Sequence, residues 1–324
     1  MSDKLIQQFK KIKDLLWGAK NILIISHEGP DADAIGSMLA LQLSLQKIGL
    51  KAVVFSHDYP PKYLNFLPGF DYIANSDSPS GDEDIFFCLD YGDFQRLGLP
   101  INISEEKIIT IDHHPESNHK GAIKIIEPTI SSTSEILYSL INYLGIEIDK
   151  NIATCLLTGI LHDTGGLKHA VTTSETLRIV SDLLSTGISF DEISRKTLTV
   201  GKSLTNSKIW AEILSRVSFD KKRKFAFSWI SFDDFEKHNV VFSELEGIAS
   251  LMSTISDASF SLFLIEHERG KIDGSLRSEP HKGRSVVEIA KALGGGGHNF
   301  AAGFKQEGTI EEALKKVYNF IDSE

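Results

Sequence analysis

The chain has little cysteine, no long apolar run and no excess of positive charge. Its 324 residues include two cysteines, Cys88 and Cys155, and both lie within short apolar segments. This disfavours a disulfide framework and a thiolate-rich metal site, and favours two buried thiols. No segment approaches the roughly 18 consecutive apolar residues of a membrane-spanning helix, and residues 1–20 lack the apolar core of a signal peptide. We expect a cytoplasmic protein with no membrane partner.

Positive charge is scarce, because 34 Lys and Arg stand against 44 Asp and Glu and leave a formal net charge of −10. Proteins that hold long duplex nucleic acid neutralise many phosphates with Lys and Arg. The charge balance therefore argues against a long duplex as partner. It does not exclude small phosphorylated substrates, because bound cations can supply positive charge locally.

The length favours two domains, and contents of 41% hydrophobic and 24% charged residues are ordinary for a globular protein. In the first half, strand-like apolar runs alternate with helical patterns, which predicts an α/β fold with a mostly parallel sheet and helices on both faces. The second half predicts a smaller α/β domain with a mixed sheet. We place the first domain at 1–189, a helical connector at 190–214 and the second domain at 215–324.

Periodicity places the individual elements. After an opening amphipathic helix, the first domain is expected to have strands at 21–25, 51–55, 84–90, 107–112 and 122–126, and helices at 34–48, 132–144, 151–161 and 174–185. Ser132 and Glu135 have the spacing of a capping box at the start of one helix. The second domain is expected to have strands at 225–232, which alternates like an antiparallel strand, 259–266 and 271–277, and helices at 286–293 and 309–322.

Acidic and imidazole side chains recur in four segments, where predicted elements end. They are His27, Asp31, Asp33, Asp90, Asp112, His113, His114 and Asp163. We expect them at one edge of the sheet, outside the carboxyl ends of the strands, which is where ligands bind in open α/β sheets. A single such Asp is usually a turn or cap residue. Carboxylates gathered from four segments repel one another, so we expect positive charge among them.

The types of side chain narrow the choice of metal. Carboxylates with a few imidazoles suit Mn²⁺, Mg²⁺ or Zn²⁺, and the number of ligands is enough for two ions. Two ions about 3.5–4 Å apart can hold a hydroxide nucleophile and clamp the attacking and leaving oxygens of a phosphoryl group. The residues alone thus predict a two-metal site suited to phosphoryl chemistry.

Four motifs of the first domain resemble, in order, those of the DHH phosphoesterase family. They are residues 27–37 (HEGPDADAIGS), Asp90, residues 112–114 (DHH) and residues 163–165 (DTG). That family includes RecJ-type exonucleases and manganese-dependent inorganic pyrophosphatases. Residues 274–278 (GSLRS) and 294–303 (GGGGHNFAAG) resemble the signatures of the DHH-associated C-terminal domain. The resemblance covers nearly the whole chain.

The resemblance implies two divalent metal ions, Mn²⁺ in the first place and Mg²⁺ as the alternative. The implied ligands are His27, Asp31, Asp33, Asp90, His113 and Asp163. His27 and Asp31 would bind the first ion, Asp90 would bridge both ions, and the other three would bind the second. His114 would contact a phosphate oxygen or the water, and Asp112 would orient an imidazole.

In the second domain, the resemblance implies a site for the terminal phosphate of the substrate. The implied residues are Ser275, Arg277, Ser278, Gly296, Gly297 and His298, with the glycines offering backbone N–H groups to an anion. The segment 166–169 departs from many relatives, which carry an aromatic residue soon after the Asp-Thr-Gly, and Lys168 would stand in for their basic residue. The remaining histidines, among them His119, His162 and His169, are expected to be exposed or internally hydrogen-bonded.

Two-domain members of this length resemble oligoribonucleases that trim very short RNAs and remove the 3′-phosphate from adenosine 3′,5′-bisphosphate. We therefore expect that activity. The alternatives are hydrolysis of cyclic di-AMP or linear pApA, and a nucleotide-binding regulator without catalysis. Inorganic pyrophosphatase is less expected, because that branch typically lacks the Gly-rich His signature. A homodimer is an open alternative to a monomer.

Overall fold

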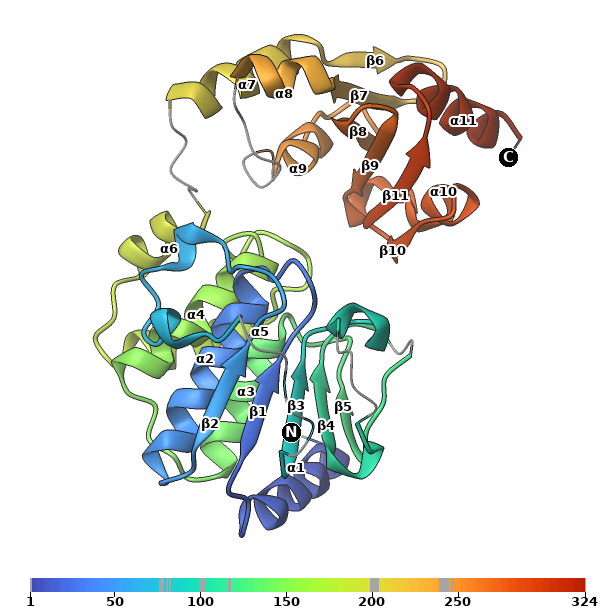
Figure 1. Cartoon of the computed structure of the whole chain (residues 1–324). Helices are drawn as coiled ribbons and strands as arrows, with labels where there is room; N and C mark the ends of the chain where they lie inside the picture. Colours follow the sequence, from blue (N-terminus) through green and yellow to red (C-terminus); the bar gives the residue numbers. More distant parts are fainter. Residues whose placement is uncertain are drawn as a thin grey trace. The chain divides into compact units, whose positions relative to one another are not determined.

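The computed structural model describes residues 2–75, 79, 81, 83–98, 103–115, 118–198, 204–238, 245 and 247–323. The chain divides into two compact units, 1–201 and 202–324 (Figure 1). In the described parts, every helix is too short or too polar to cross a membrane. Both cysteines are buried and free, as predicted.

The first unit is built on a five-stranded, fully parallel sheet, which confirms the predicted mostly parallel sheet. Its strands lie in the order β2-β1-β3-β4-β5. They are β1 (Ile22–Ile25), β2 (Ala52–Phe55), β3 (Ile85–Leu89), β4 (Ile108–Asp112) and β5 (Ile123–Ile126). The strand order reverses between β1 and β3, and in open sheets of this order that switch point is where ligands bind.

Six α-helices belong to this unit, and the core residues of α1 to α6 lie in one apolar cluster with one face of the sheet. They are α1 (Asp3–Leu16), α2 (Ala32–Lys47), α3 (Thr133–Tyr143), α4 (Lys150–Asp163), α5 (Ser174–Leu184) and α6 (Phe190–Leu198). Ile22 and Ile24 of β1 point into this cluster, whereas Leu23 and Ile25 point to the opposite face. The 3₁₀-helix η3 (Phe94–Leu97) and loop residues cover that face. Because both faces are buried there, the central strands β1 and β3 are apolar throughout.

Helix ends differ from the predictions in ways that matter for the site. Helix α2 begins two residues earlier than predicted, since Asp31 caps it. At α3, Ser132 accepts the N–H of Glu135 as a capping box requires. The Glu135 carboxylate, however, accepts hydroxyl groups of Ser131 and Thr176. Helix α4 extends to Asp163, so this residue comes from a helix end and not from an edge of the sheet.

The second unit has a six-stranded mixed sheet, as predicted, in the order β10-β11-β9-β8-β7-β6. Its strands are β6 (Ser218–Asp220), β7 (Phe225–Ile230), β8 (Phe260–Glu268), β9 (Lys271–Ser278), β10 (Gly296–His298) and β11 (Ala301–Glu307). Only β7 and β8 pair in parallel, so β7 is antiparallel to β6 alone. The helices are α7 (Leu204–Ser215), α8 (Phe232–His238), α9 (Ile248–Ser253), α10 (Val287–Ala292) and α11 (Ile310–Ser323).

Strands β6, β10 and β11 were not expected from the sequence. Glycine disfavours strands, so the Gly-rich segment 294–303 gave no strand signal. The antiparallel pairing of β10 with β11 stabilises these strands although their glycines have low strand propensity. The predicted connector, 190–214, contains α6 and the larger part of α7, while 199–203 lie outside the described residues. Its limits stay a prediction.

Candidate metal centre

The loop between β1 and α2 carries the first group of polar side chains. Asp31 caps α2 with Oδ1, which accepts the N–H groups of Asp33 at 2.9 Å and Ala34 at 3.0 Å. Its Oδ2 instead faces the Nε2 atoms of His27 at 3.9 Å and His162 at 3.7 Å. One oxygen thus fixes the helix, and the other points at two imidazoles.

Asp33, in the first turn of α2, is fully buried. Its two oxygens accept the N–H groups of Thr133 at 2.7 Å and Ser134 at 3.0 Å, at the start of α3. Gly159 of α4 makes room, since a Cβ there would overlap Asp33 Oδ1. Each oxygen accepts one N–H and keeps a second lone pair for a cation.

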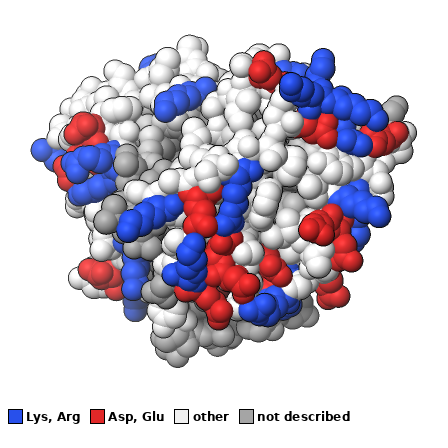
Figure 2. All heavy atoms as spheres, turned by 90° about the horizontal axis from the view of Figure 1, so that it is seen from above, with Lys and Arg blue, Asp and Glu red and all other residues white. Residues whose placement is uncertain are grey.

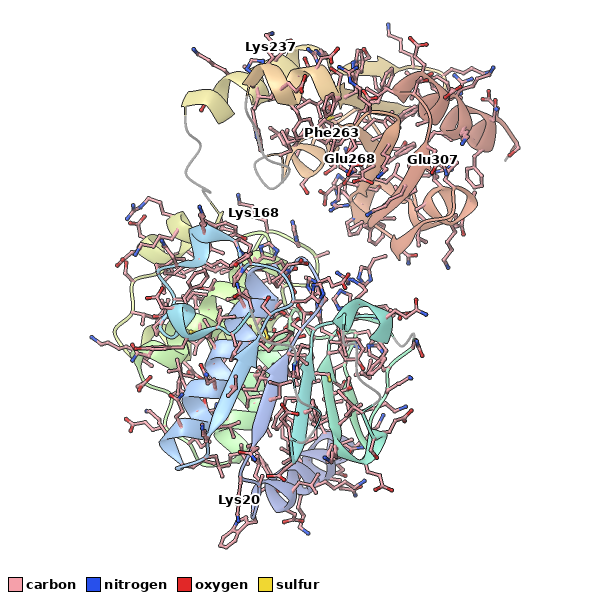
Figure 3. All side chains as sticks on the ribbon, viewed as in Figure 1. Lys20, Lys168, Lys237, Phe263, Glu268 and Glu307 are labelled. Atoms are coloured by element: carbon pink, nitrogen blue, oxygen red, sulfur yellow. The ribbon has the colours of Figure 1, made fainter. Side chains whose placement is uncertain are left out.

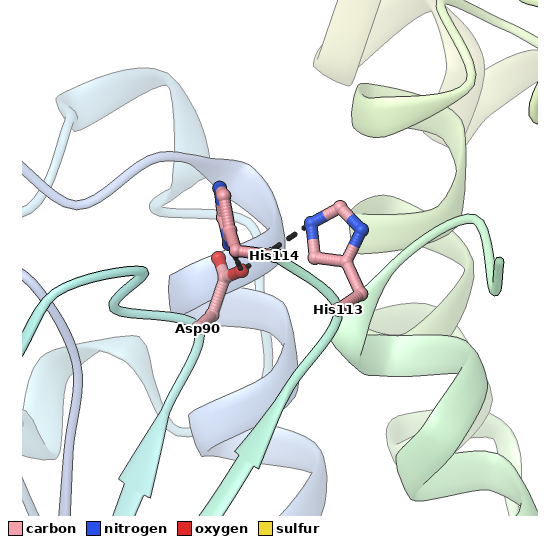
Figure 4. A group of neighbouring side chains, drawn as sticks. All are labelled: Asp90, His113 and His114. Carbon is pink, nitrogen blue, oxygen red and sulfur yellow. Dashed lines mark ion pairs between the residues drawn. The ribbon is translucent and has the colours of Figure 1, made fainter. Parts of the chain in front are cut away.

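Asp90 follows β3 directly and has a left-handed backbone, with φ of 51°. Such a conformation is strained for a residue other than glycine, although Asp tolerates it better than most. It is held by a hydrogen bond from its N–H to the carbonyl of Ile111 and by one from Thr133 Oγ1 to Asp90 Oδ1. Oδ1 lies 3.6 Å from His113 Nε2 and 3.5 Å from His114 Nδ1, and dashed lines mark these ion pairs in Figure 4.

Asp112, the last residue of β4, is the centre of a buried hydrogen-bond network. It accepts the backbone N–H groups of Tyr91, Gly92 and His114, and it contacts His114 Nδ1 at 2.8 Å and His119 Nε2 at 3.1 Å. Burial opposes ionisation, but the imidazoles and these N–H groups hold the pKa of Asp112 far below its usual range. Asp112 therefore fixes the ring of His114.

The six predicted ligands lie together in four overlapping groups of three residues. Within each group, the ligand atoms lie within 4.8 Å of one another. The groups are His27 with Asp31 and Asp90; Asp90 with His113 and His114; Asp33 with His113 and Asp163; and Asp31 with His162 and Asp163. His113 Nε2 and Asp163 Oδ2 approach to 3.1 Å. Asp90 belongs both to the group of His27 and Asp31 and to the group of His113 and His114. A ligand that bridges two ions needs such a shared position.

Sequence reasoning missed His162, which it placed among the histidines without a role. The structure brings its ring to Asp31 and Asp163 at the end of α4. The sequence signal was weak, since only adjacency to Asp163 distinguished it. His119 has an internal partner in Asp112, and His169 has one in the carbonyl of Asp163 at 3.0 Å.

The segment 166–169 takes a tight turn after α4. Leu167 has φ of 69° and is partly buried against the core of the unit. Lys168, labelled in Figure 3, is exposed, and its role as a substitute base stays a prediction.

The carboxyl groups of the site repel one another strongly. Burial, and next the charge of Asp163, raise the pKa of Asp33 to about 7. Burial, together with Asp33 and Asp31, raises the pKa of Asp90 well above its usual range. Desolvation also opposes ionisation of Asp31, but His162, His27 and two backbone N–H groups lower its pKa to about 2. Buried carboxylates whose charges oppose each other are a donor set that fits divalent cations.

The pKa values of the two buried imidazoles, His113 and His27, are shifted in opposite directions. Burial opposes protonation of His113, but its hydrogen bond to Asp163 and the charges of Asp163 and Asp90 outweigh this and raise its pKa. For His27, burial lowers the pKa and so favours the neutral ring that a metal ligand requires. Without a cation, protonated His113 supplies the positive charge that the carboxylates need.

The predicted phosphate-binding residues of the second unit lie on β9 and β10, the two strands that flank β11. Arg277 of β9 pairs with Ala301 of β11, which pairs with His298 of β10. Directly paired residues project to the same face, so Arg277 and His298 lie about 10 Å apart with a small alanine between them. Ser275, two residues before Arg277, shares that face.

Ser278 and the glycines are placed differently. Ser278 follows Arg277 in β9, so its side chain projects to the opposite face of the sheet. It is buried there, and its hydroxyl donates to the carbonyl of Ser259. Gly297 has φ of 133°, and a Cβ there would lie 2.6 Å from the Ala301 carbonyl oxygen. Gly296 has open space around it. The structure therefore brings Arg277, Ser275 and His298 to one face, but not Ser278.

A parallel sheet with this rim of carboxylates and imidazoles defines the class of metal-dependent phosphoesterases. The model of the DHH family, N-terminal domain, matches residues 21–160, and that of the DHHA1 domain matches residues 205–323. The chain belongs to the DHH family and is a hydrolase of phosphate ester bonds.

Three similar proteins illustrate the family. A bifunctional oligoribonuclease and PAP phosphatase NrnA of Thermus thermophilus is 30% identical over 305 residues, which cover 94% of this chain and 90% of the relative. A probable manganese-dependent inorganic pyrophosphatase of Streptococcus mutans is 28% identical over 204 residues, 60% of this chain and 64% of the relative. The crystal structure of an exopolyphosphatase-related protein from Bacteroides fragilis superposes with a TM-score of 0.88 at 29% identity, and covers 98% of this chain and 96% of that chain.

Proposed function

We propose that this protein hydrolyses very short oligoribonucleotides to mononucleotides and removes the 3′-phosphate from adenosine 3′,5′-bisphosphate, using two divalent cations at the rim of the first unit. The observation that carries the proposal is the sharing of Asp90 between ligand groups on both sides of the site. The NrnA relative, which aligns over most of both chains, is named for these two activities.

Manganese is the proposed ion. Mixed carboxylate and imidazole ligands suit Mn²⁺, and the pyrophosphatase relative is named as manganese-dependent. His27, Asp31 and Asp90 would hold one ion, and Asp33, His113 and Asp163 would hold the other with Asp90 between them. His162 is a further donor beside Asp31 and Asp163.

Bound divalent cations would lower the pKa of a coordinated water from about 15.7 to about 7 and neutralise charge on the phosphoryl group. The protein's own residues then position the reactants. Asp112 fixes the Nδ1–H tautomer of His114, which directs Nε2 to a phosphate oxygen or a water. Asp33 and Asp90 are held by N–H and hydroxyl donors, so little reorganisation is needed during the reaction.

Arg277 would bind a second phosphate of the substrate, together with His298 and Ser275. Desolvation lowers the pKa of Arg277, and the only hydrogen bond described for its guanidinium goes to the neighbouring carbonyl of Leu276. A desolvated guanidinium that has no carboxylate partner forms strong, charge-assisted hydrogen bonds with a phosphate anion. Short substrates with a terminal phosphate would thus be preferred. Ser278, Gly296 and Gly297 would act by shaping the strands. The buried free thiols are consistent with the proposed cytoplasmic location.

The test is a substrate panel assayed with Mn²⁺, with EDTA and with the Asp90→Asn variant. The panel contains a dinucleotide, longer single-stranded RNAs, adenosine 3′,5′-bisphosphate, linear pApA, cyclic di-AMP and pyrophosphate. We expect fastest turnover of the shortest RNAs and of the bisphosphate, loss with EDTA, and recovery with Mn²⁺. Asn tolerates the left-handed backbone of Asp90, so this variant should fold and lose at least about 100-fold in kcat, since it removes a charged ligand.

Other outcomes decide against specific parts of the proposal. Equal rates on a dinucleotide and a long RNA would refute the preference for short substrates. Turnover of cyclic di-AMP or pApA alone would replace the proposed substrate. Absence of any Mn²⁺-dependent hydrolysis would leave a nucleotide-binding regulator, which the complete ligand set argues against.

A further inference from the structure

Arg96 connects two of the segments that carry candidate metal ligands, the loop after β1 and the loop after β3. It sits in η3, six residues after Asp90, and Asp93 caps this short helix by accepting the N–H of Gln95 at 2.9 Å. The carbonyl of Arg96 accepts the N–H of Glu28 at 2.7 Å. Its backbone therefore ties the loop after β3 to the loop after β1, at the switch point of the sheet.

The guanidinium of Arg96 points at the site and not away from it. Nη2 lies 3.0 Å from His27 Nδ1, and Nη1 lies 3.4 Å from the carbonyl of Tyr91. A Cβ built on Gly92 would be 3.6 Å from Arg96 Nη1 and 3.6 Å from the ring of His114. Arg96 and His114 thus border the same small space above Gly92. Arg96 is exposed, so a ligand can reach it.

Arg96 differs from most other arginines of the chain in its electrostatic partners. Arg178, Arg216, Arg223 and Arg269 each pair with a carboxylate at 2.6–2.7 Å. Within the described residues, no carboxylate lies at ion-pair distance from Arg96, and its side-chain partners are an imidazole nitrogen and a carbonyl. No described carboxylate therefore forms an ion pair with its guanidinium.

Arg96 can donate a hydrogen bond to His27 Nδ1 only when that nitrogen carries no proton. Nδ1 also lies 2.8 Å from the carbonyl oxygen of Glu28. It can donate a proton to that carbonyl or accept one from Arg96, but it cannot do both. When Nε2 serves as a ligand, the ring proton is on Nδ1 and goes to Glu28. The guanidinium then loses an acceptor and presents its N–H groups to the space beside His114.

We propose that Arg96 is a catalytic residue that donates hydrogen bonds to the non-bridging oxygens of the phosphoryl group undergoing hydrolysis. Its planar fork of donors matches two phosphate oxygens, and its charge is available at the place where negative charge gathers during the reaction. The proposal deepens the proposed function and rests on it for the reaction, but its test uses phosphate binding.

The test compares Arg96→Ala, Arg96→Lys and the control Arg195→Ala, which removes an exposed arginine from α6 of the same unit. Calorimetry measures Mn²⁺ binding alone, and then binding of inorganic phosphate to the Mn²⁺-loaded protein. We expect Arg96→Ala to weaken phosphate binding by about 10- to 100-fold, the range for a lost hydrogen bond to a charged group. Arg96→Lys should lose less, Arg195→Ala should match the wild type, and Mn²⁺ affinity should change by less than about threefold.

Two results would overturn the assignment. Unchanged phosphate affinity in Arg96→Ala would show that the guanidinium does not contact phosphate. A loss of Mn²⁺ affinity as large as the loss of phosphate affinity would show that Arg96 only positions His27. If the wild type hydrolyses no nucleotide of the panel but phosphate binding still depends on Arg96, the proposed substrates fail and the contact of Arg96 with a phosphate group stands.

Discussion

At the scale of single residues, the site is governed by carboxylates that cannot all be ionised together without a cation. Asp33 and Asp90 have raised pKa values because they are buried next to other carboxylates. His113 has a raised pKa because those carboxylates surround it. Metal binding must displace the protons that these groups hold.

This predicts a pH dependence of Mn²⁺ affinity. The pKa of Asp33 is about 7 without metal, so protons compete with the ion below that pH and stop competing above it. A group with that pKa is about ten times more ionised at pH 8 than at pH 6. We therefore expect calorimetric affinity to fall by at least about tenfold from pH 8 to pH 6, with proton release on binding.

The control for this prediction is Asp33→Asn, which should bind Mn²⁺ more weakly at both values and show a smaller change with pH. Equal affinity of the wild-type protein at pH 6 and pH 8 would contradict the role of Asp33 as an ionising ligand.

At the scale of elements, the site exists because the ends of three helices, α2, α3 and α4, and of three strands, β1, β3 and β4, meet in one place. The N-terminus of α3 donates two N–H groups to Asp33 of α2, and α4 contributes Asp163 from its C-terminal end. Helices α2 and α4 pack closely, since a Cβ on Gly36 would overlap the carbonyl of Cys155. The small residues at this contact let the carboxylates approach each other.

The packing of α4 predicts how a single methyl group would disturb the centre. A methyl at Gly159 would overlap Asp33 Oδ1 and Ser134 Oγ, and overpacking of this kind costs about 1–3 kcal/mol of stability. We expect Gly159→Ala to lower both the free energy of unfolding in urea and, by about tenfold or more, the affinity for Mn²⁺. A displaced carboxylate is the physical reason for the second effect.

The matched variant is Gly36→Ala, whose methyl presses on the backbone of α4 and not on Asp33. It should lose similar stability but much less Mn²⁺ affinity. Equal losses of Mn²⁺ affinity in the two variants would mean that helix spacing, and not the position of Asp33, controls binding.

At the scale of the whole molecule, the two units have separate cores, and the proposed function gives them separate chemical roles. The candidate metal ligands found among the described residues belong to the first unit, and Arg277, the proposed phosphate-binding arginine, belongs to the second. On the face drawn in Figure 2, acidic and basic side chains are interspersed and the described residues form no continuous positive stripe. Together with the formal net charge of −10, this argues against a broad positive field as the source of substrate affinity.

This division predicts the calorimetric response to metal. Binding to the folded state alone stabilises a unit by about 2.7 kcal/mol at a hundred times Kd. We expect Mn²⁺ to raise the temperature of one unfolding transition, that of the first unit, and to leave the transition of the second unit within about one degree. Asp90→Asn should remove the shift. An equal shift of both transitions in the wild type would show that the units do not unfold independently.

The sequence by itself determined the alternation of strands and helices in the first unit, since continuous apolar runs and capping residues act locally. It also determined the six predicted ligands that the structure brings together, because successive motifs lie at the ends of successive elements, but it missed His162. It did not reveal β10 and β11, whose Gly-rich strands are stabilised by pairing and not by propensity.

Only the tertiary structure decided which atoms of these residues meet. His162 enters the site because α4 ends beside Asp31, Ser278 is buried where its hydroxyl donates to the carbonyl of Ser259, and Arg96 reaches His27 across two loops. These contacts join residues far apart in the chain or depend on the exact end of an element. They follow from packing in three dimensions, which no local pattern of residues encodes.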